Sequence, residues 1–413
     1  MRFPLPLRHR RAAARTARPR ALRLVVPCLA ALCGFLPPAP PPAAGQPPRV
    51  VSVRPLTALD DAFRAYAERV RAPDHWTGGD STYSVPMADG RLWVFSDTFL
   101  GTVRPDGSRS PVVEDGGTTP FVHNSFVLWN RRGPRTVTGR DRSGRAVSLV
   151  AGAGRDEWCW ARAGVPDGRG VAVVYARYAR TGSDPLDVAW RGNVLARFRP
   201  ERLSRPLSLT PLPSSAGVSW GAWLERQGGH TYVYGTEPAA GGGSHLRLAR
   251  VPGSDLRGPW RYRAADGTWS ARESRAARLS GPGGAALRVS DELSVVRHGS
   301  WYALVTQRAD RPFSPDIQLA WSRAPGGPFG RPRTVYRAPE AGPLGTYRDP
   351  DVFAYNPHEH PGLGRRGELV LSYNVNSLVP DDVIRRAGIY RPRFLRVGLS
   401  PAVRPGERSP HRS

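Results

Sequence analysis

One stretch, Trp76 to Gly101, limits the possible folds more than any other part of the chain because it reads as a complete β-hairpin. Two apolar, strand-like runs, Tyr83–Val85 and Leu92–Phe95, flank the turn sequence Ala-Asp-Gly at 88–90. Glycine adopts positive φ without strain, so an Asp-Gly pair between two such runs predicts a tight antiparallel turn. The stretch therefore predicts sheet structure built from short hairpins.

An aspartate stands at each end of this hairpin. Asp80 precedes the first run and Asp97 follows the second. The two ends of an antiparallel pair lie side by side, so we expect both carboxylates at the same end of the element.

The same hairpin pattern recurs along the chain. Short apolar runs alternate with Gly, Pro and Asp turns from Trp76 onward, which is typical of all-β proteins. Four further hairpins are predicted at 158–163 with 171–175, 220–224 with 231–234, 293–296 with 301–305, and 352–355 with 369–373. Third strands are predicted at 193–198, 245–251, 317–322 and 394–397, and outer strands at 256–262 and 327–336. Repeated units of roughly 60–70 residues predict an all-β, five-bladed β-propeller of four-stranded antiparallel blades; a β-sandwich or barrel with irregular insertions is the alternative.

The segments that flank the repeats have their own character. Residues 45–75 contain a predicted strand at Val50–Val53 and a short helix at Thr57–Val70. We expect that strand to complete the last blade of the propeller at 76–400, beside Phe394–Val397. Residues 401–413 are rich in Pro, Arg and Ser and are expected to be disordered.

The first 44 residues have the composition of a leader. Residues 1–23 contain eight arginines and no acid, and the apolar run Leu24–Leu36 is too short to span a bilayer comfortably. Small residues follow near Ala44, and this order predicts a secretory signal peptide at 1–44. We therefore expect a secreted, extracellular protein with no stable membrane span after cleavage; a retained membrane anchor is the alternative.

The charge and cysteine content limit the partners. The formal net charge is +26, and all 60 basic residues are arginines scattered along the chain, without the basic stripe that tracks phosphates. We therefore expect a polysaccharide or cell-wall glycan as the partner, and no nucleic acid. Cys159 is the only cysteine outside the leader, which leaves no internal disulfide, so stability must come from burial of the core. We also expect a monomer.

Acidic residues recur where the predicted inner strands begin. Asp80, Glu292 and Asp351 precede the first, fourth and fifth hairpins. Inner strands of a propeller surround a central channel, so these carboxylates would meet at one mouth of it. Carboxylates in one cleft cannot all ionise comfortably, and the resulting split in pKa supplies the acid and the base of glycoside hydrolysis. These three residues are the predicted catalytic residues.

Polar and aromatic residues near the same strand ends are predicted to bind substrate. They are Trp76, Asp97, His123, Asn124, Glu157, Trp158, Trp220 and Asn374. Tryptophan rings could stack on sugar faces, but they could equally fill blade cores, and the His-Asn pair could be structural.

No metal-binding residues and no cofactor are predicted. His358 and His360 would share a face of an extended segment, but a lone His-x-His without further ligands gives weak support for a metal. No nucleophile elbow, Walker loop or dinucleotide fingerprint occurs. A structural Ca²⁺ held by acids in the central channel is a further alternative.

Four motifs in the chain resemble secreted actinobacterial proteins of the domain-of-unknown-function families 5005 and 4185. The motifs are Trp76-Thr-Gly-Gly-Asp-Ser-Thr-Tyr-Ser-Val-Pro, Trp93-Val-Phe-Ser-Asp-Thr-Phe-Leu-Gly, Phe121-Val-His-Asn-Ser and Asp349-Pro-Asp-Val-Phe-Ala-Tyr-Asn-Pro. The resemblance extends from about Trp76 to Val397, and its first block is the specific part. It implies a five-bladed propeller similar in architecture to the furanosidases of glycoside hydrolase family 43. Some relatives of the second family are endo-D-arabinanases, which implies furanose polymers such as arabinan or arabinogalactan as the substrate class.

The family-43 pattern has a base Asp on the first blade, a pKa-tuning Asp on the second and an acid Glu on the third. Asp80 fits the first role. The third hairpin has no acid at its start, so we assign the acid to Glu292, with Asp97 and Asp351 orienting substrate or tuning pKa values. The predicted function is a secreted glycoside hydrolase; the alternative is a non-catalytic glycan-binding propeller, which an aromatic, acid-poor mouth would favour.

Overall fold

The computed structural model describes residues 45–400, apart from 70–71, 155 and 183–186. The described residues belong to one unit, which begins at Gly45. The predicted leader at 1–44 and the predicted tail at 401–413 lie outside the described residues. Within the described part of the chain, no helix is both long and apolar enough to cross a membrane.

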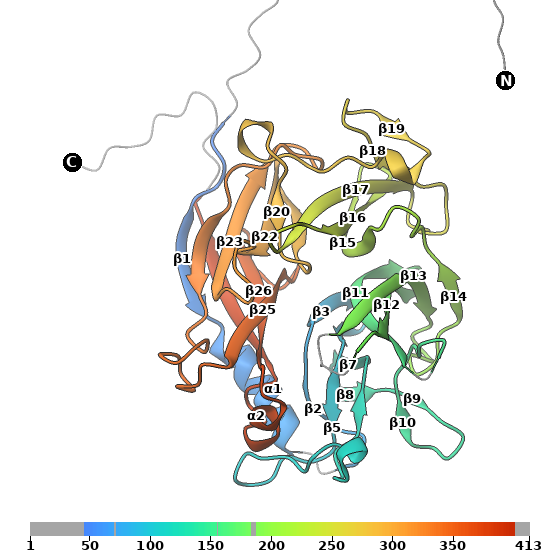
Figure 1. Cartoon of the computed structure of the whole chain (residues 1–413), viewed down its shortest axis with the longest axis vertical. Coiled ribbons are helices and arrows are strands. Elements are labelled where there is room, and N and C mark those ends of the chain that lie inside the picture. Colours follow the sequence, from blue (N-terminus) through green and yellow to red (C-terminus); the bar gives the residue numbers. More distant parts are fainter. Residues whose placement is uncertain (1–44, 70–71, 155, 183–186, 401–413) are drawn as a thin grey trace, which may run out of the picture. The chain divides into compact units, whose positions relative to one another are not determined.

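Antiparallel sheets, here called sheets I to V, form the framework (Figure 1). Sheet I has the strand order β3 (Tyr83–Met87), β4 (Gly90–Phe95), β7 (Ser125–Asn130), β8 (Gly133–Val137). Sheet II has the order β11 (Glu157–Asp167), β12 (Gly170–Arg180), β13 (Val188–Phe198), β14 (Ser208–Pro211). Sheet III has the order β15 (Ser219–Gln227), β16 (His230–Pro238), β17 (Ser244–Pro252), β18 (Arg261–Arg263), β19 (Trp269–Ser270), and β20 (Arg288–Val289) also pairs with β17. Sheet IV has the order β21 (Ser294–His298), β22 (Trp301–Gln307), β23 (Asp316–Ser322), β24 (Arg333–Arg337). Sheet V has the order β25 (Val352–Glu359), β26 (Glu368–Ser377), β27 (Pro392–Leu399), β1 (Val50–Pro55).

Smaller elements lie between these sheets. One small sheet joins β2 (Trp76–Gly79), β5 (Thr98–Leu100) and β6 (Phe121–Val122), and another joins β9 (Gly139–Arg140) and β10 (Ala146–Val147). The helices are α1 (Thr57–Arg69) and α2 (Pro380–Arg385), with 3-10 turns at Val113–Asp115, Glu273–Arg275 and Pro282–Gly284. Helix α1 buries Phe63 and Tyr66 in an aromatic cluster with Phe95 and Phe394.

The hairpin predicted between Trp76 and Gly101 is confirmed. Strands β3 and β4 pair antiparallel, with Met87 opposite Gly90 at the turn. Gly90 has φ 121°, and a Cβ built there would lie 2.2 Å from the carbonyl oxygen of Trp129, so the turn requires glycine. The four later hairpins also form where predicted, as β11–β12, β15–β16, β21–β22 and β25–β26.

The N-terminal strand pairs with the C-terminal strand, as predicted. β1 runs antiparallel to β27, with Val53 opposite Val397. The backbone amide of Leu56 continues this contact by donating to the carbonyl of Phe394 at 2.8 Å. Residues at the two ends of the described chain therefore belong to one sheet.

The first strands of successive sheets lie next to one another: β3 beside β11, β11 beside β15, β15 beside β21, and β21 beside β25. The register shifts inside three of them, between Ala161 and Gly164, Trp220 and Trp223, and Tyr355 and His358. Such bulges re-aim side chains and are frequent beside active sites.

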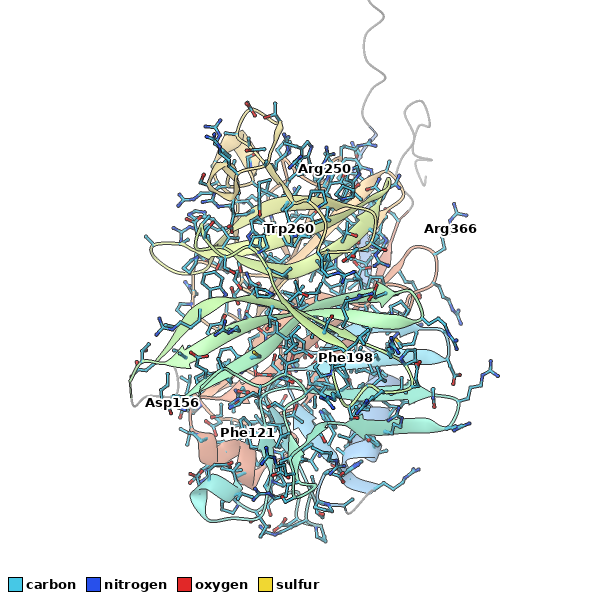
Figure 2. All side chains as sticks on the ribbon, turned by 90° about the vertical axis from the view of Figure 1, so that its right-hand side faces the viewer. Phe121, Asp156, Phe198, Arg250, Trp260 and Arg366 are labelled. Carbon is cyan, nitrogen blue, oxygen red and sulfur yellow. The ribbon has the colours of Figure 1, made fainter. Side chains whose placement is uncertain are left out.

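We call the end at which these inner strands begin the mouth. Figure 2 shows Asp156, which precedes β11, and Arg366, in the turn after β25, on opposite sides of the view. Asp80, Glu292 and Asp351 precede β3, β21 and β25, so they stand at the ends of these strands that we call the mouth.

Candidate active site

Asp80 lies in a strained turn that leads into β3. Ser81 and Thr82 both have positive φ, 61° and 40°, which costs free energy for residues with a Cβ. The amide of Asn374 holds this turn, because its Nδ2 donates to the carbonyl of Gly79 at 3.2 Å and to Thr82 Oγ1 at 2.8 Å. Strain fixed by a buried clamp is typical of functional sites.

Two tyrosines and a second aspartate surround the Asp80 carboxyl. Tyr355 donates its hydroxyl to Asp80 Oδ2 at 2.8 Å, and the backbone amide of Asp80 donates to the carbonyl of Asp97. Burial and then the charge of Asp97 raise the pKa of Asp80 to about 7, although the hydroxyls of Tyr390 and Tyr355 lower it. Asp80 can therefore exchange a proton near neutral pH.

Glu292 reaches the same turn from the segment before β21. Its Oε1 accepts a 2.7 Å hydrogen bond from the hydroxyl of Ser81, the residue next to Asp80. Its Oε2 lies 3.3 Å from Nε2 of His358, and burial lowers the pKa of that histidine to about 3, so its ring is neutral. Burial raises the pKa of Glu292 to about 8, against the opposing charge of Arg162. Glu292 thus keeps its proton at neutral pH.

Arg162 is a buried cation in the bulge of β11. Its Nη2 lies 2.6 Å from Asp291 Oδ2 and donates to Ser219 Oγ at 3.1 Å. Asp291 is half exposed and also accepts from the hydroxyl of Thr236. A buried guanidinium needs such a partner, so Asp291 neutralises Arg162 while Glu292 remains protonated.

Asp97 organises the opposite side of the turn. Its Oδ1 lies 2.8 Å from His123 Nδ1 and accepts a 2.8 Å hydrogen bond from Trp160 Nε1. Burial lowers the pKa of His123, but the charge and hydrogen bond of Asp97 outweigh it, so the net pKa is raised. The ring of His123 stacks on Trp158 with centroids 5.3 Å apart. Asp97, His123 and Trp158, predicted from sequence, are thus brought together at the mouth.

Three other predicted substrate-binding residues do not reach the mouth, and these assignments are corrected. Trp76 and Trp220 are fully buried in the core; Trp220 Nε1 donates to Glu273 at 2.8 Å. Asn124 is also fully buried, and its amide bonds the backbone of Val150 and Cys159. These three side chains therefore have structural roles in the core, since they expose no surface to a ligand.

Three further predicted residues, Asn374, Glu157 and the predicted catalytic Asp351, hydrogen-bond neither the Asp80 nor the Glu292 carboxyl. Asn374 is buried behind the turn, where it positions Asp80 rather than facing a ligand. Glu157 pairs with Arg177 at 3.2 Å. The side chain of Asp351 makes no hydrogen bond or ion pair with another described residue, and β25 contributes Tyr355 to the carboxylate cluster instead.

The histidines considered as metal ligands are both buried near the inner strands. His358 lies against the ring of Tyr83, and His360 Nδ1 contacts Ser84 Oγ at 2.9 Å. In the described part of the chain, no group of three or more His, Cys, Asp or Glu residues is arranged to hold a metal ion.

The sequence analysis missed Tyr355, Tyr390, Arg162 and Ser81. Tyr355 lies within the quoted motif at 349–357 but, like Tyr390, meets Asp80 only in the folded chain, so its role could not be predicted from local sequence. Arg162 did carry a signal, because an arginine between Ala161 and Ala163 breaks the apolar run of a predicted inner strand.

Comparisons with known proteins were made on the sequence and on the fold. The model of the family described as "Domain of unknown function (DUF5005)" matches residues 60–399. A candidate hydrolase from Bacteroides ovatus has 21% sequence identity and a TM-score of 0.67, over 84% of this chain and 90% of that chain. A GH43_1 enzyme from Xanthomonas citri, complexed with xylose, has 14% identity and a TM-score of 0.43, over 83% and 93% of the two chains. The GH43 β-xylosidase/α-arabinofuranosidase CoXyl43, from a compost metagenome, has 15% identity and a TM-score of 0.45, over 86% and 95%. A comparison with curated protein sequences finds no match. The Bacteroides ovatus protein shows a shared fold.

Proposed function

The chain belongs to the family defined by the domain of unknown function DUF5005, and we propose that it is a glycoside hydrolase. One observation carries the proposal: Glu292 accepts a hydrogen bond from Ser81, the residue next to Asp80, so two buried carboxyl groups share one turn, with pKa values raised to about 7 for Asp80 and about 8 for Glu292. Hydrolysis of a glycosidic bond requires two carboxyl groups: one that holds a proton at the working pH and one that has released it. The mouth carries several carboxyl groups, and this favours a hydrolase over a non-catalytic glycan-binding propeller.

The two carboxyls take different roles because their environments differ. Asp80 accepts a hydrogen bond from the hydroxyl of Tyr355, which favours its charged form, so its carboxylate acts as the base that activates a water molecule. Glu292 remains protonated and donates its proton to the departing glycosidic oxygen. Asp97 raises the pKa of Asp80 and orients His123 and Trp160 beside it.

The substrate class is a furanose-containing polysaccharide of the arabinan type, which is supported by the motifs around Trp76–Gly101 and 349–357. The partly exposed indole of Trp160 suits the apolar face of a sugar ring, whereas Trp158 is buried and packs against it. The composition of residues 1–44 supports export, so the substrate would be met outside the cell.

We also propose that the fold that carries this site is a closed, five-bladed β-propeller. Sheets I to V would be the blades, and pairing of β1 with β27 supports closure of the ring through sheet V. Contacts between sheets V and I support it as well, since Asn374 bonds Thr82 and Tyr355 bonds Asp80. In this arrangement the mouth is where all five inner strands begin.

A product assay tests the function. Purified protein is incubated with arabinan, arabinogalactan, xylan and pectic polymers, beside Asp80→Asn and the control Asp89→Asn, which changes an exposed turn at the other end of the hairpin. We expect new oligosaccharides from the wild type and the control, and none from Asp80→Asn. Retention of one polymer without any product from the wild type would replace the hydrolase with a glycan-binding propeller.

A further inference from the structure

An exposed aromatic side chain stands on the rim of the mouth, on a loop that the function described so far does not use. Phe313 lies between β22 and β23, and 37% of its surface is exposed. Its φ of 51° places a non-glycine residue in the left-handed region, which costs free energy unless the surroundings impose it.

The loop around Phe313 is anchored from below. The side-chain amide of Gln307, which is buried at the end of β22, donates to the carbonyl of Ser314 and, at 2.7 Å, to the carbonyl of Ala354 in β25. Arg308 adds ion pairs to Asp310 and Asp316 across the base of the loop. These contacts fix the loop on both sides of Phe313.

A line of aromatic rings connects Phe313 with the catalytic carboxylate. The ring of Phe313 lies 4.1 Å from that of Phe353, and Phe353 lies 5.2 Å from Tyr355, measured between centroids. The hydroxyl of Tyr355 bonds Asp80. On the side formed by sheet II, Trp160 bonds Asp97 and contacts Tyr178. Aromatic faces therefore approach the carboxylates from two directions.

We propose that Phe313, supported by Phe353, forms an outer subsite that binds a sugar ring of a polymeric glycan whose cleaved bond lies at Asp80 and Glu292. An exposed ring held at the surface at the cost of backbone strain offers an apolar face to the C–H face of a sugar. This subsite belongs to the site proposed above and depends on that assignment. It predicts that the enzyme prefers chains long enough to reach from the carboxylates to the rim.

The test separates binding from turnover and from folding. Phe313→Asn removes the ring but keeps a residue that tolerates left-handed φ, Phe313→Tyr keeps the ring, and Leu363→Ala is the control. Leu363 is equally exposed, at 37%, but lies in the turn after β25, away from the mouth. Retention of each variant is measured by native gel electrophoresis in arabinan, together with kcat/KM on arabinan and on 4-nitrophenyl arabinofuranoside.

We expect Phe313→Asn to weaken retention and kcat/KM on arabinan about tenfold, the effect of losing one stacked ring, and to leave the aryl furanoside unaffected. Phe313→Tyr and Leu363→Ala should match the wild type, and Phe313→Asn should remain folded, with a single cooperative urea transition. Unchanged retention by Phe313→Asn, or an equal loss on both substrates, would each overturn the subsite. Absence of retention and of turnover by the wild type would instead overturn the proposed function, and the subsite with it.

Discussion

Replacing Asp80 by asparagine should stabilise the folded protein, and more so as the pH rises. The pKa of Asp80 is about 7 in the folded protein, against an ordinary value of 3.8, because burial penalises its charged form. Between these two values the folded protein keeps a proton that the unfolded chain has released. The stability of the wild type therefore falls as the pH rises towards 7, and becomes level above it.

The size of this pH-dependent change in stability follows from the shift in the pKa of Asp80. About three pKa units at 1.36 kcal/mol each correspond to about 4 kcal/mol over the whole range, and about 3 kcal/mol of it lies between pH 5 and pH 8. Asparagine has no proton to release, and Tyr355 can still donate its hydroxyl to the amide oxygen. The advantage of Asp80→Asn over the wild type should therefore grow by about 3 kcal/mol between these two pH values.

Urea denaturation at pH 5 and pH 8 measures the difference. Asp89→Asn is the control, since it makes the same substitution at a mostly exposed side chain at the other end of the hairpin. A constant difference between Asp80→Asn and the wild type at both pH values would refute the reasoning, because it would mean that Asp80 is ionised throughout. A variant less stable at pH 8 would show that the carboxylate is an attractive partner in the fold.

Three further variants or reagents test neighbouring parts of the structure. Tyr355→Phe removes a hydrogen bond to the charged form of Asp80, so the acidic limb of the pH–rate profile should move up by about one to two units; an unmoved limb would contradict the contact. Arg109→Met leaves buried carbonyls unpaired where the guanidinium now bonds them, and should lower the free energy of unfolding by about 3 kcal/mol in urea titrations. Cys159 is buried with its pKa raised to about 12, so thiol reagents should label it only after unfolding; fast labelling at pH 8 would contradict its burial.

Local sequence patterns predicted the strands best. The Asp-Gly turn at 89–90 fixed the first hairpin because only glycine fits beside the carbonyl of Trp129. The outer strands were harder: β14 has the sequence Ser-Leu-Thr-Pro, which carries no alternation of apolar residues, and its one leucine, Leu209, is half exposed. The pairing of β1 with β27 could be predicted only from the general tendency of propellers to pair strands from the two ends of the chain.

The site was predicted in part. Asp80 and Glu292 stood at the starts of inner strands and Asp97 at the end of the strand paired with the first of them, and these positions were enough to bring them together. Trp76 and Trp220 stood near strand starts as well, but they face the interior, and alternation of side chains cannot be read reliably where strands begin or bulge. Contacts between segments that are distant in sequence, such as those of Tyr355 and Tyr390 with Asp80, cannot be predicted from local sequence patterns.

The division of roles between the two carboxyls is the central claim, and activity on substrates with different leaving groups tests it most directly. An acid is needed only when the leaving group is poor, whereas the base is needed in every case. The kcat/KM of Glu292→Gln and of Asp80→Asn would be compared on polymer and on the dinitrophenyl furanoside of the sugar released from it. We expect Glu292→Gln to lose about a thousandfold on the polymer and less than about tenfold on the activated substrate, and Asp80→Asn to lose both activities. Equal losses of Glu292→Gln on the two substrates, or full activity of Asp80→Asn on either, would contradict the assignment.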